Sequence, residues 1–180
     1  KHGGFYAIIA YDTKGRYVEI TNFGPDGKSY KEADGANKMK FQWDERDYLT
    51  CAEVSVPDSL GVYTKSGKIE IDRDERGNPT RLRTTMPDGS LQNSSFQFDE
   101  AGNWLGEEKY DNDGKLINKS VYTYDKKGNF VQEANYGKNN ELVNDKTSGY
   151  ARMVIAYDSR GLATDTTYYN ARGKIVKPKK

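Results

Sequence analysis

The chain of 180 residues is 34% hydrophobic and 31% charged, so it is poor in the aliphatic side chains that usually fill a core. Its 28 basic and 27 acidic residues leave a net charge of +1, which gives no electrostatic basis for binding nucleic acid. No apolar run approaches the ~20 residues of a membrane-spanning helix, and the single cysteine excludes an internal disulfide. Aromatic residues make up 12% of the chain and recur at regular intervals, which argues against disorder and suits β-strands.

Segments in which apolar and polar residues alternate follow one another along the chain. In chain order they include residues 39–43, 69–72, 96–98, 104–110, 115–124, 130–136 and 153–157. A period of two with one apolar face predicts half-buried antiparallel strands. The residues expected on the inner face are Phe41, Ile71, Phe96, Phe98, Tyr122, Tyr124 and Ile155, and those expected on the outer face are Gln42, Asp72, Gln97 and Thr123.

Two turns at a fixed spacing accompany each pair of strands, and they define six units. The first turn of each unit begins at an aspartate: Asp12, Asp44, Asp74, Asp99, Asp125 or Asp158. Three positions later stand Gly15, Asp47, Gly77, Gly102, Gly128 and Gly161, and twelve positions after those stand Gly27, Ser59, Gly89, Gly114, Asn140 and Gly173. Aspartate can bond the backbone of its own turn, and glycine adopts a positive φ without strain. We therefore expect these positions to be structural turns, with Asp47 and Asn140 in the left-handed conformation of the glycines.

A fixed period of this kind indicates a repeat architecture. The sequence predicts an all-β fold, an antiparallel meander of tandem β-hairpins with about twelve strands and no helix. We expect one repeat domain over residues 1–180, with longer loops at residues 30–38, 61–68 and 144–150. Because one apolar face must be covered, the sheet is expected to roll into an open, barrel-like array. The alternatives are packing in two layers and pairing with another copy of the chain.

Two of the turns carry a resemblance to a known family. The segments from Tyr124 to Asn129 and from Phe98 to Asn103 resemble the Tyr-Asp-x-x-Gly-Asn core of YD repeats, which occur in Rhs-type bacterial proteins, toxin shells and bacterial surface proteins. Arg73 and Trp43 replace the tyrosine of that core in other units. The resemblance implies repeats that build β-sheet walls and are not themselves catalytic.

The sequence offers no catalytic, cofactor-binding or metal-binding residues. His2 is the only histidine, so neither a Ser-His nor a Cys-His pair can form. Cys51 falls in a predicted strand and is expected to be a buried, unreactive thiol. Glu107 and Glu133 occupy equivalent places in neighbouring units and are a weak candidate for a carboxylate pair. Residues 111–114 resemble the start of a calcium loop, but the twelfth position is Tyr122 where a bidentate acid is required.

Surface aromatic residues are the best candidates for contact with a partner, with the alternative that the rings fill the thin core of a chain poor in aliphatic residues. Tyr168, Tyr169, Trp104 and Tyr63 are the residues proposed for this role, and adjacent Tyr168 and Tyr169 should point to opposite faces. We expect a non-catalytic bacterial surface or periplasmic module that binds a protein or a glycan. The alternative is a structural segment of a larger YD-repeat shell or toxin-associated protein. Both predict an extracellular or periplasmic location, by resemblance alone.

Overall fold

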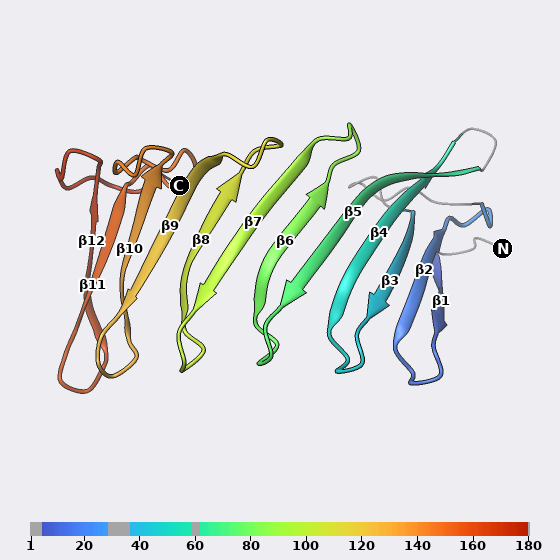
Figure 1. Cartoon of the computed structure of the whole chain (residues 1–180), viewed down its shortest axis with the longest axis horizontal. Helices are drawn as coiled ribbons and strands as arrows, with labels where there is room; N and C mark the ends of the chain where they lie inside the picture. The colour runs from blue at the N-terminus through green and yellow to red at the C-terminus, as the bar shows by residue number, and fades with distance from the viewer. Residues whose placement is uncertain (1–4, 29–36, 59–61, 180) are drawn as a thin grey trace. The chain divides into compact units, whose positions relative to one another are not determined.

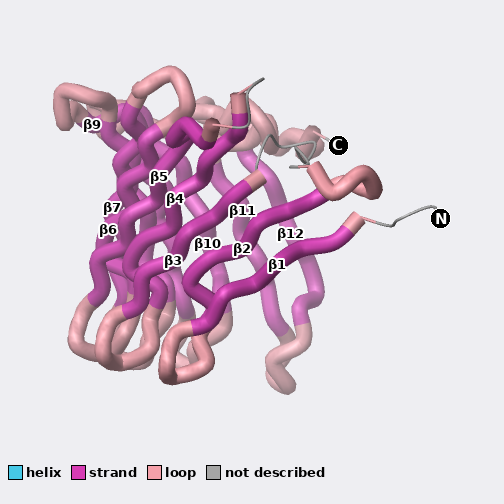
Figure 2. The backbone as a smooth tube through the Cα atoms, turned by 90° about the vertical axis from the view of Figure 1, so that its right-hand side faces the viewer, coloured by secondary structure: helices cyan, strands magenta, loops and turns pink. Residues whose placement is uncertain are grey.

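In the computed structural model, residues 5–28, 37–58 and 62–179 are described, so His2 and Ser59 lie outside them. These residues form strands and loops only, without a helix that could span a membrane (Figure 2). The twelve strands in the described residues are β1 (Tyr6–Tyr11), β2 (Tyr17–Phe23), β3 (Lys38–Trp43), β4 (Leu49–Pro57), β5 (Tyr63–Arg73), β6 (Pro79–Thr85), β7 (Leu91–Phe98), β8 (Trp104–Tyr110), β9 (Leu116–Tyr124), β10 (Phe130–Gly137), β11 (Arg152–Tyr157) and β12 (Ala163–Tyr169). The prediction of an all-β antiparallel meander is confirmed.

The chain divides into two compact units, residues 1–92 and residues 93–180. Unit 1 holds β1 to β6, and unit 2 holds β7 from Asn93 onward and β8 to β12; within each unit consecutive strands pair antiparallel (Figure 1). The boundary falls between the repeat anchored at Asp74 and the one anchored at Asp99. The prediction of a longer loop at residues 61–68 is wrong, since β5 begins at Tyr63, whereas residues 144–150 form the expected loop. Most of the loop predicted at residues 30–38 lies outside the described residues.

Each aspartate turn is a tight hairpin loop, and it is built in the same way six times. In the hairpin from β9 to β10, the Gly128 amide donates to the Asp125 carbonyl at 3.0 Å, and the Asp125 carboxylate accepts the amides of Lys127 and Asn129 at 2.8 and 2.9 Å. The strand register shifts by one residue beside the turn, between Phe130 and Gln132. A type I turn followed by a left-handed residue and a bulge gives this geometry.

The predicted left-handed residues are confirmed wherever the structure describes them. The φ angles of the turn glycines lie between +73° and +89°: Gly15, Gly27, Gly77, Gly89, Gly102, Gly114, Gly128, Gly161 and Gly173. Asp47 and Asn140 replace glycine with φ of 67° and 64°. Asp47 has a further role, because its carboxylate accepts hydrogen bonds from Arg16 at 2.6 Å and from Lys14 at 3.2 Å in the neighbouring turn.

The predicted assignment of side chains to the inner and outer faces is confirmed, but the predicted depth of burial of the inner face is wrong. Gln42, Asp72, Gln97 and Thr123 are exposed as expected, whereas their inner-face counterparts are only half-buried. The buried hydrophobic residues among those described are Cys51, Ala134 and Ala151. Within each unit, contacts join consecutive strands and no second layer covers the sheet in the described residues. The apolar face is therefore partly open to solvent.

Candidate functional site

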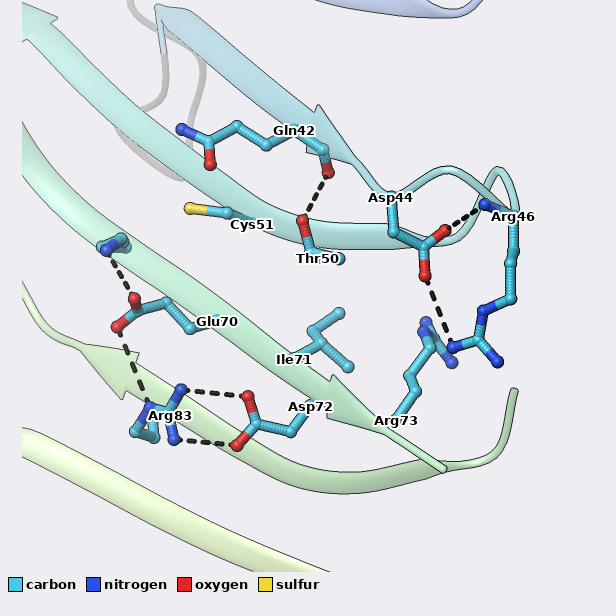
Figure 3. Close-up of a pocket in the computed structure, with 11 residues that line it drawn as sticks. Gln42, Asp44, Arg46, Thr50, Cys51, Glu70, Ile71, Asp72, Arg73 and Arg83 are labelled. Carbon is cyan, nitrogen blue, oxygen red and sulfur yellow. Dashed lines mark hydrogen bonds and ion pairs between the residues drawn. The ribbon is translucent and has the colours of Figure 1, made fainter. Parts of the chain in front are cut away.

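A hollow of about 460 Å³ lies on the polar face of unit 1, over β3 to β6 (Figure 3). Most of its charged groups are paired with one another: the Arg83 guanidinium contacts the Asp72 carboxylate at 2.9 and 3.1 Å, and Glu70 accepts from Lys68 at 2.6 Å, whereas Arg73 donates to the Gly77 carbonyl. Cys51 lies beside these pairs and is buried, as predicted, and burial raises the pKa of its thiol. A raised thiol pKa leaves little thiolate at neutral pH, so this hollow is a face of solvated ion pairs without a nucleophile.

The aromatic face of unit 2 is a stronger candidate site. We define it by two rows of residues that the strand register places side by side on one face of the sheet. The lower row is Tyr122, Glu133, Met153 and Tyr168. The upper row is Phe96, Glu107, Ser120 and Asn135. Apart from Asn135, which is buried, all of these residues are half-buried, so the face combines aromatic rings with polar groups that solvent still reaches.

Ring contacts make the aromatic face continuous. Trp104 lies 4.5 Å from Tyr122 and 6.2 Å from Phe96 between ring centroids. Phe130 continues the series, with its ring centroid 5.9 Å from that of Tyr122. At the other side of the face, Tyr150 from the loop after β10 lies 5.0 Å from Tyr168. The tilted ring geometries are those that aromatic pairs prefer, and the rings therefore hold one another in place.

Hydrogen bonds join the polar groups of the aromatic face into one network. Glu133 accepts the Tyr150 hydroxyl at 3.0 Å and the Asn135 side-chain amide at 3.2 Å. The Ser120 hydroxyl donates to the Asn135 side-chain oxygen at 2.8 Å. Burial, followed by the charge of Glu133, raises the pKa of Tyr150 to about 12, so its hydroxyl stays protonated and able to donate.

Glu107 and Glu133, the carboxylates paired by sequence position, both belong to this face and lie on the strands that flank β9. The Ser94 hydroxyl donates to Glu107 at 2.8 Å, and the Lys109 ammonium lies 3.6 Å from it. Glu133 is bound by neutral donors instead. The two carboxylates therefore differ in their partners, although the repeat gives them equivalent positions.

A second hollow, of about 440 Å³, opens beside the aromatic face near the loop after β10. Its lining includes Lys109, Asn118, Asn135 and Asp145. The mixture of cationic, anionic and amide groups suits a polar ligand of variable composition better than a purely apolar one. No group of histidine, cysteine, aspartate and glutamate able to hold a metal ion occurs within the described ranges.

The structure separates the four aromatic residues proposed from the sequence. Trp104 and Tyr168 contribute to the aromatic face, whereas Tyr169 lies on the opposite face with the Arg152 guanidinium 4.5 Å from its ring centroid. Tyr63 belongs to unit 1, where the Lys38 ammonium lies 5.4 Å from its ring centroid. Sequence reasoning missed Tyr150, since it lies in a loop where the strand alternation gives no signal.

No protein-family model matches the sequence, and no curated protein is significantly similar to it. Among solved structures, a crystal structure of TcdB2-TccC3 superposes with a TM-score of 0.63 at 14% identity over 91% of this chain. A Bacteroides fragilis protein of unknown function matches with a TM-score of 0.31 at 16% identity, over 75% of this chain and 92% of its own. A porin-like protein from Bacteroides uniformis matches with a TM-score of 0.35 at 13% identity, over 90% of this chain and 81% of its own.

The two Bacteroides superpositions are too loose to support an argument. The chain spans 7% of the length of the TcdB2-TccC3 chain it matches. At this identity the likeness concerns the fold alone, and it fits the Rhs/YD-like β-sheet fold that the Tyr-Asp turns resemble.

Proposed function

We propose that this chain is a non-catalytic β-sheet wall segment that contacts a polypeptide partner through the aromatic face of unit 2. The observation that carries the proposal is the half-exposed state of that face. Large exposed or half-exposed apolar surfaces on a folded protein mark sites of interaction. Here rings and hydrogen-bonding groups lie side by side over several strands, which is the composition of a protein-binding surface.

The likeness to TcdB2-TccC3 supports the structural half of the proposal. A single-layer sheet that matches a small part of a much longer chain is suited to form part of a wall. An extracellular or cell-envelope setting is the location we propose on the same basis. We propose a role without catalysis because Glu107 and Glu133 each accept a hydrogen bond from a neighbouring side chain, and because the free thiol of Cys51 is buried.

A polypeptide fits this face better than a glycan does. Neutral sugars can stack on rings and donate to carboxylates, but they cannot compensate a negative charge. A polypeptide offers apolar, neutral and cationic side chains in an extended arrangement. The mixed lining of the adjacent hollow, which includes Lys109 and Asp145, is also suited to side chains of both charges.

The test measures binding of an unfolded polypeptide, reduced and carboxymethylated ribonuclease A, by fluorescence anisotropy. Replacing Trp104 and Tyr168 together by alanine should weaken binding by roughly tenfold or more, because large buried aromatics dominate such surfaces. Tyr169→Ala on the opposite face is the matched control and should leave binding unchanged. Equal losses in both variants, or tighter binding of an oligosaccharide such as chitotetraose, would contradict the proposal.

A further inference from the structure

Glu133 is a half-buried strand carboxylate that forms no ion pair with any described residue, whereas most other strand carboxylates do. Among the described residues, lysine or arginine pairs with most strand carboxylates: Lys38 with Glu19 at 2.7 Å, Lys65 with Glu53 at 2.7 Å, Lys68 with Glu70 at 2.6 Å, Arg83 with Asp72 at 2.9 Å and Lys109 with Glu107 at 3.6 Å. Glu108 also forms no ion pair among the described residues: it accepts the Tyr110 hydroxyl, and the ammonium of Lys119, which is opposite it in the register, lies 5.3 Å from the Tyr136 ring centroid. Glu133 instead has Tyr122 and Met153 opposite it, and both are uncharged.

The surroundings of Glu133 make an uncompensated charge unfavourable. The carboxylate is half-buried between rings, where the local dielectric is lower than in water and the cost of an unpaired charge rises. Its two protein donors, the Tyr150 hydroxyl and the Asn135 amide, are neutral. These donors hold the carboxylate in place but do not compensate its negative charge. The charge of Glu133 also contributes to the raised pKa of both Tyr122 and Tyr150, after burial.

Glu133 keeps hydrogen-bonding capacity for a further donor. Tyr150 donates to one carboxylate oxygen and Asn135 to the other. Because each oxygen of an ionised carboxylate can accept more than one hydrogen bond, both oxygens keep capacity for a ligand. Tyr122 lies opposite Glu133 on β9, and Tyr150 donates to it; the ring of Tyr168, two strands away, lies 5.0 Å from that of Tyr150 between centroids. Aromatic ring faces attract cations.

We propose that Glu133, with the neighbouring rings of Tyr122 and Tyr150, binds an ammonium or guanidinium group. This inference rests on the proposed function, since the group would be a lysine or arginine side chain of the polypeptide partner. The carboxylate supplies the charge-assisted hydrogen bond, and the rings supply cation–π contact and cover the side-chain stem. Asn135 and Tyr150 are positioning residues that fix the carboxylate orientation.

The probes are three short peptides, acetyl-Gly-Gly-Xaa-Gly-Gly-amide with Xaa as arginine, lysine or norleucine. Binding is followed by NMR titration of the ring protons of the face. We expect both cationic peptides to bind at least roughly tenfold more tightly than the norleucine peptide, with an advantage that shrinks as salt is added. Choline, as a small cation without a peptide backbone, should bind more weakly than either.

Three variants isolate the charge of Glu133. Glu133→Gln should remove the advantage of the cationic peptides while leaving norleucine binding unchanged. Glu108→Gln, on the opposite face, should change nothing. Tyr150→Phe should retain the preference for cations, because it removes a neutral donor and keeps both the ring and the charge. If Glu133→Gln fails to fold, Tyr150→Phe still tests the site, provided that its NMR spectrum shows it to be folded.

The outcomes separate this inference from the proposed function. If all three peptides bind equally and Trp104 and Tyr168 remain necessary for polypeptide binding, the face binds polypeptides without a cation site and the inference is overturned. Retention of the cationic preference in Glu133→Gln would also overturn it. Choline binding tighter than both peptides would overturn the assignment to a polypeptide side chain.

Discussion

Two glycines four residues apart in unit 2 are needed for different physical reasons, and alanine at each should reveal the difference. Gly102 sits in the aspartate turn with φ of +85°, and an added Cβ would meet no atom within 4 Å. Gly106 lies in strand β8, and a Cβ there would lie 2.6 Å from the Ser120 carbonyl oxygen. The first site requires a backbone conformation, whereas the second requires space.

The expected costs follow from these distances. Gly102→Ala should destabilise by about 1 kcal/mol, the strain of a left-handed residue with a Cβ. Gly106→Ala should cost about 2–3 kcal/mol, since the obstacle is backbone and β8 must move away from β9. The Gly106 carbonyl also accepts the Trp104 indole N–H at 2.8 Å, so movement of β8 should shift Trp104 as well.

Urea unfolding followed by far-UV circular dichroism gives the two free energies. Tryptophan fluorescence of the folded variants reports on Trp104 through its change relative to wild type, because the other tryptophan, Trp43, lies in unit 1. We expect a changed emission spectrum for Gly106→Ala and an unchanged one for Gly102→Ala. In a chain of this length the smaller cost corresponds to about 2–4 °C in Tm. If Gly102→Ala were neutral, or if it cost as much as Gly106→Ala, the separation of strain from steric contact would be refuted.

Three further results are expected. Asn140→Gly should be neutral or stabilise the fold by up to about 1 kcal/mol in urea unfolding, because glycine adopts the φ of 64° without strain, and a clear loss would count against this. Phe98→Ala should cost about 1–2 kcal/mol, since the ring is only half-buried, whereas Gln97→Ala should stay within about 0.5 kcal/mol, and similar costs for the two would mean that the alternation is misread. The pKa of Asp99 is lowered below 3.8, first by the hydrogen bond from the Asn103 side chain, so its stabilising effect is present above the unfolded pKa and is lost as pH falls through the folded pKa. Asp99→Asn should therefore lower Tm at pH 7 and reduce the fall in Tm below about pH 4, and an unchanged Tm at pH 7 would count against this.

The turns and the strand faces could be predicted from the sequence because both depend on local chemistry. An aspartate three residues before glycine fixes a hairpin turn wherever it stands, and the left-handed Asp47 and Asn140 follow from the same spacing. Alternation fixes which side chains share a face, as Tyr168 and Tyr169 show. Neither pattern depends on distant parts of the chain.

The depth of burial could not be predicted, because it depends on what covers the sheet. Alternation identifies an apolar face but does not say whether another layer packs on it, and the expectation of a buried core around Phe41 and Tyr122 was wrong for this reason. The partners of Glu133 were equally inaccessible to sequence reasoning. Equivalence in the repeat paired it with Glu107, whereas strand register and the loop after β10 decide that one carboxylate meets a lysine and the other a tyrosine.

The candidate cation site lies where the repeat is interrupted, and this gives a physical reason to place function there. Tyr122, Glu133 and Tyr168 occupy ordinary strand positions, but Tyr150 comes from the loop after β10, where the spacing between units is longer. A wall needs only hairpins of constant length. The hydrogen bond from the Tyr150 hydroxyl to the half-buried Glu133 carboxylate is therefore not required for strand pairing. Departures from local regularity concentrate at functional positions, because structure alone does not select them. The hollow over Cys51 offers no comparable group, because Lys68 pairs with Glu70 along β5 and Arg83 pairs with Asp72 between β6 and β5.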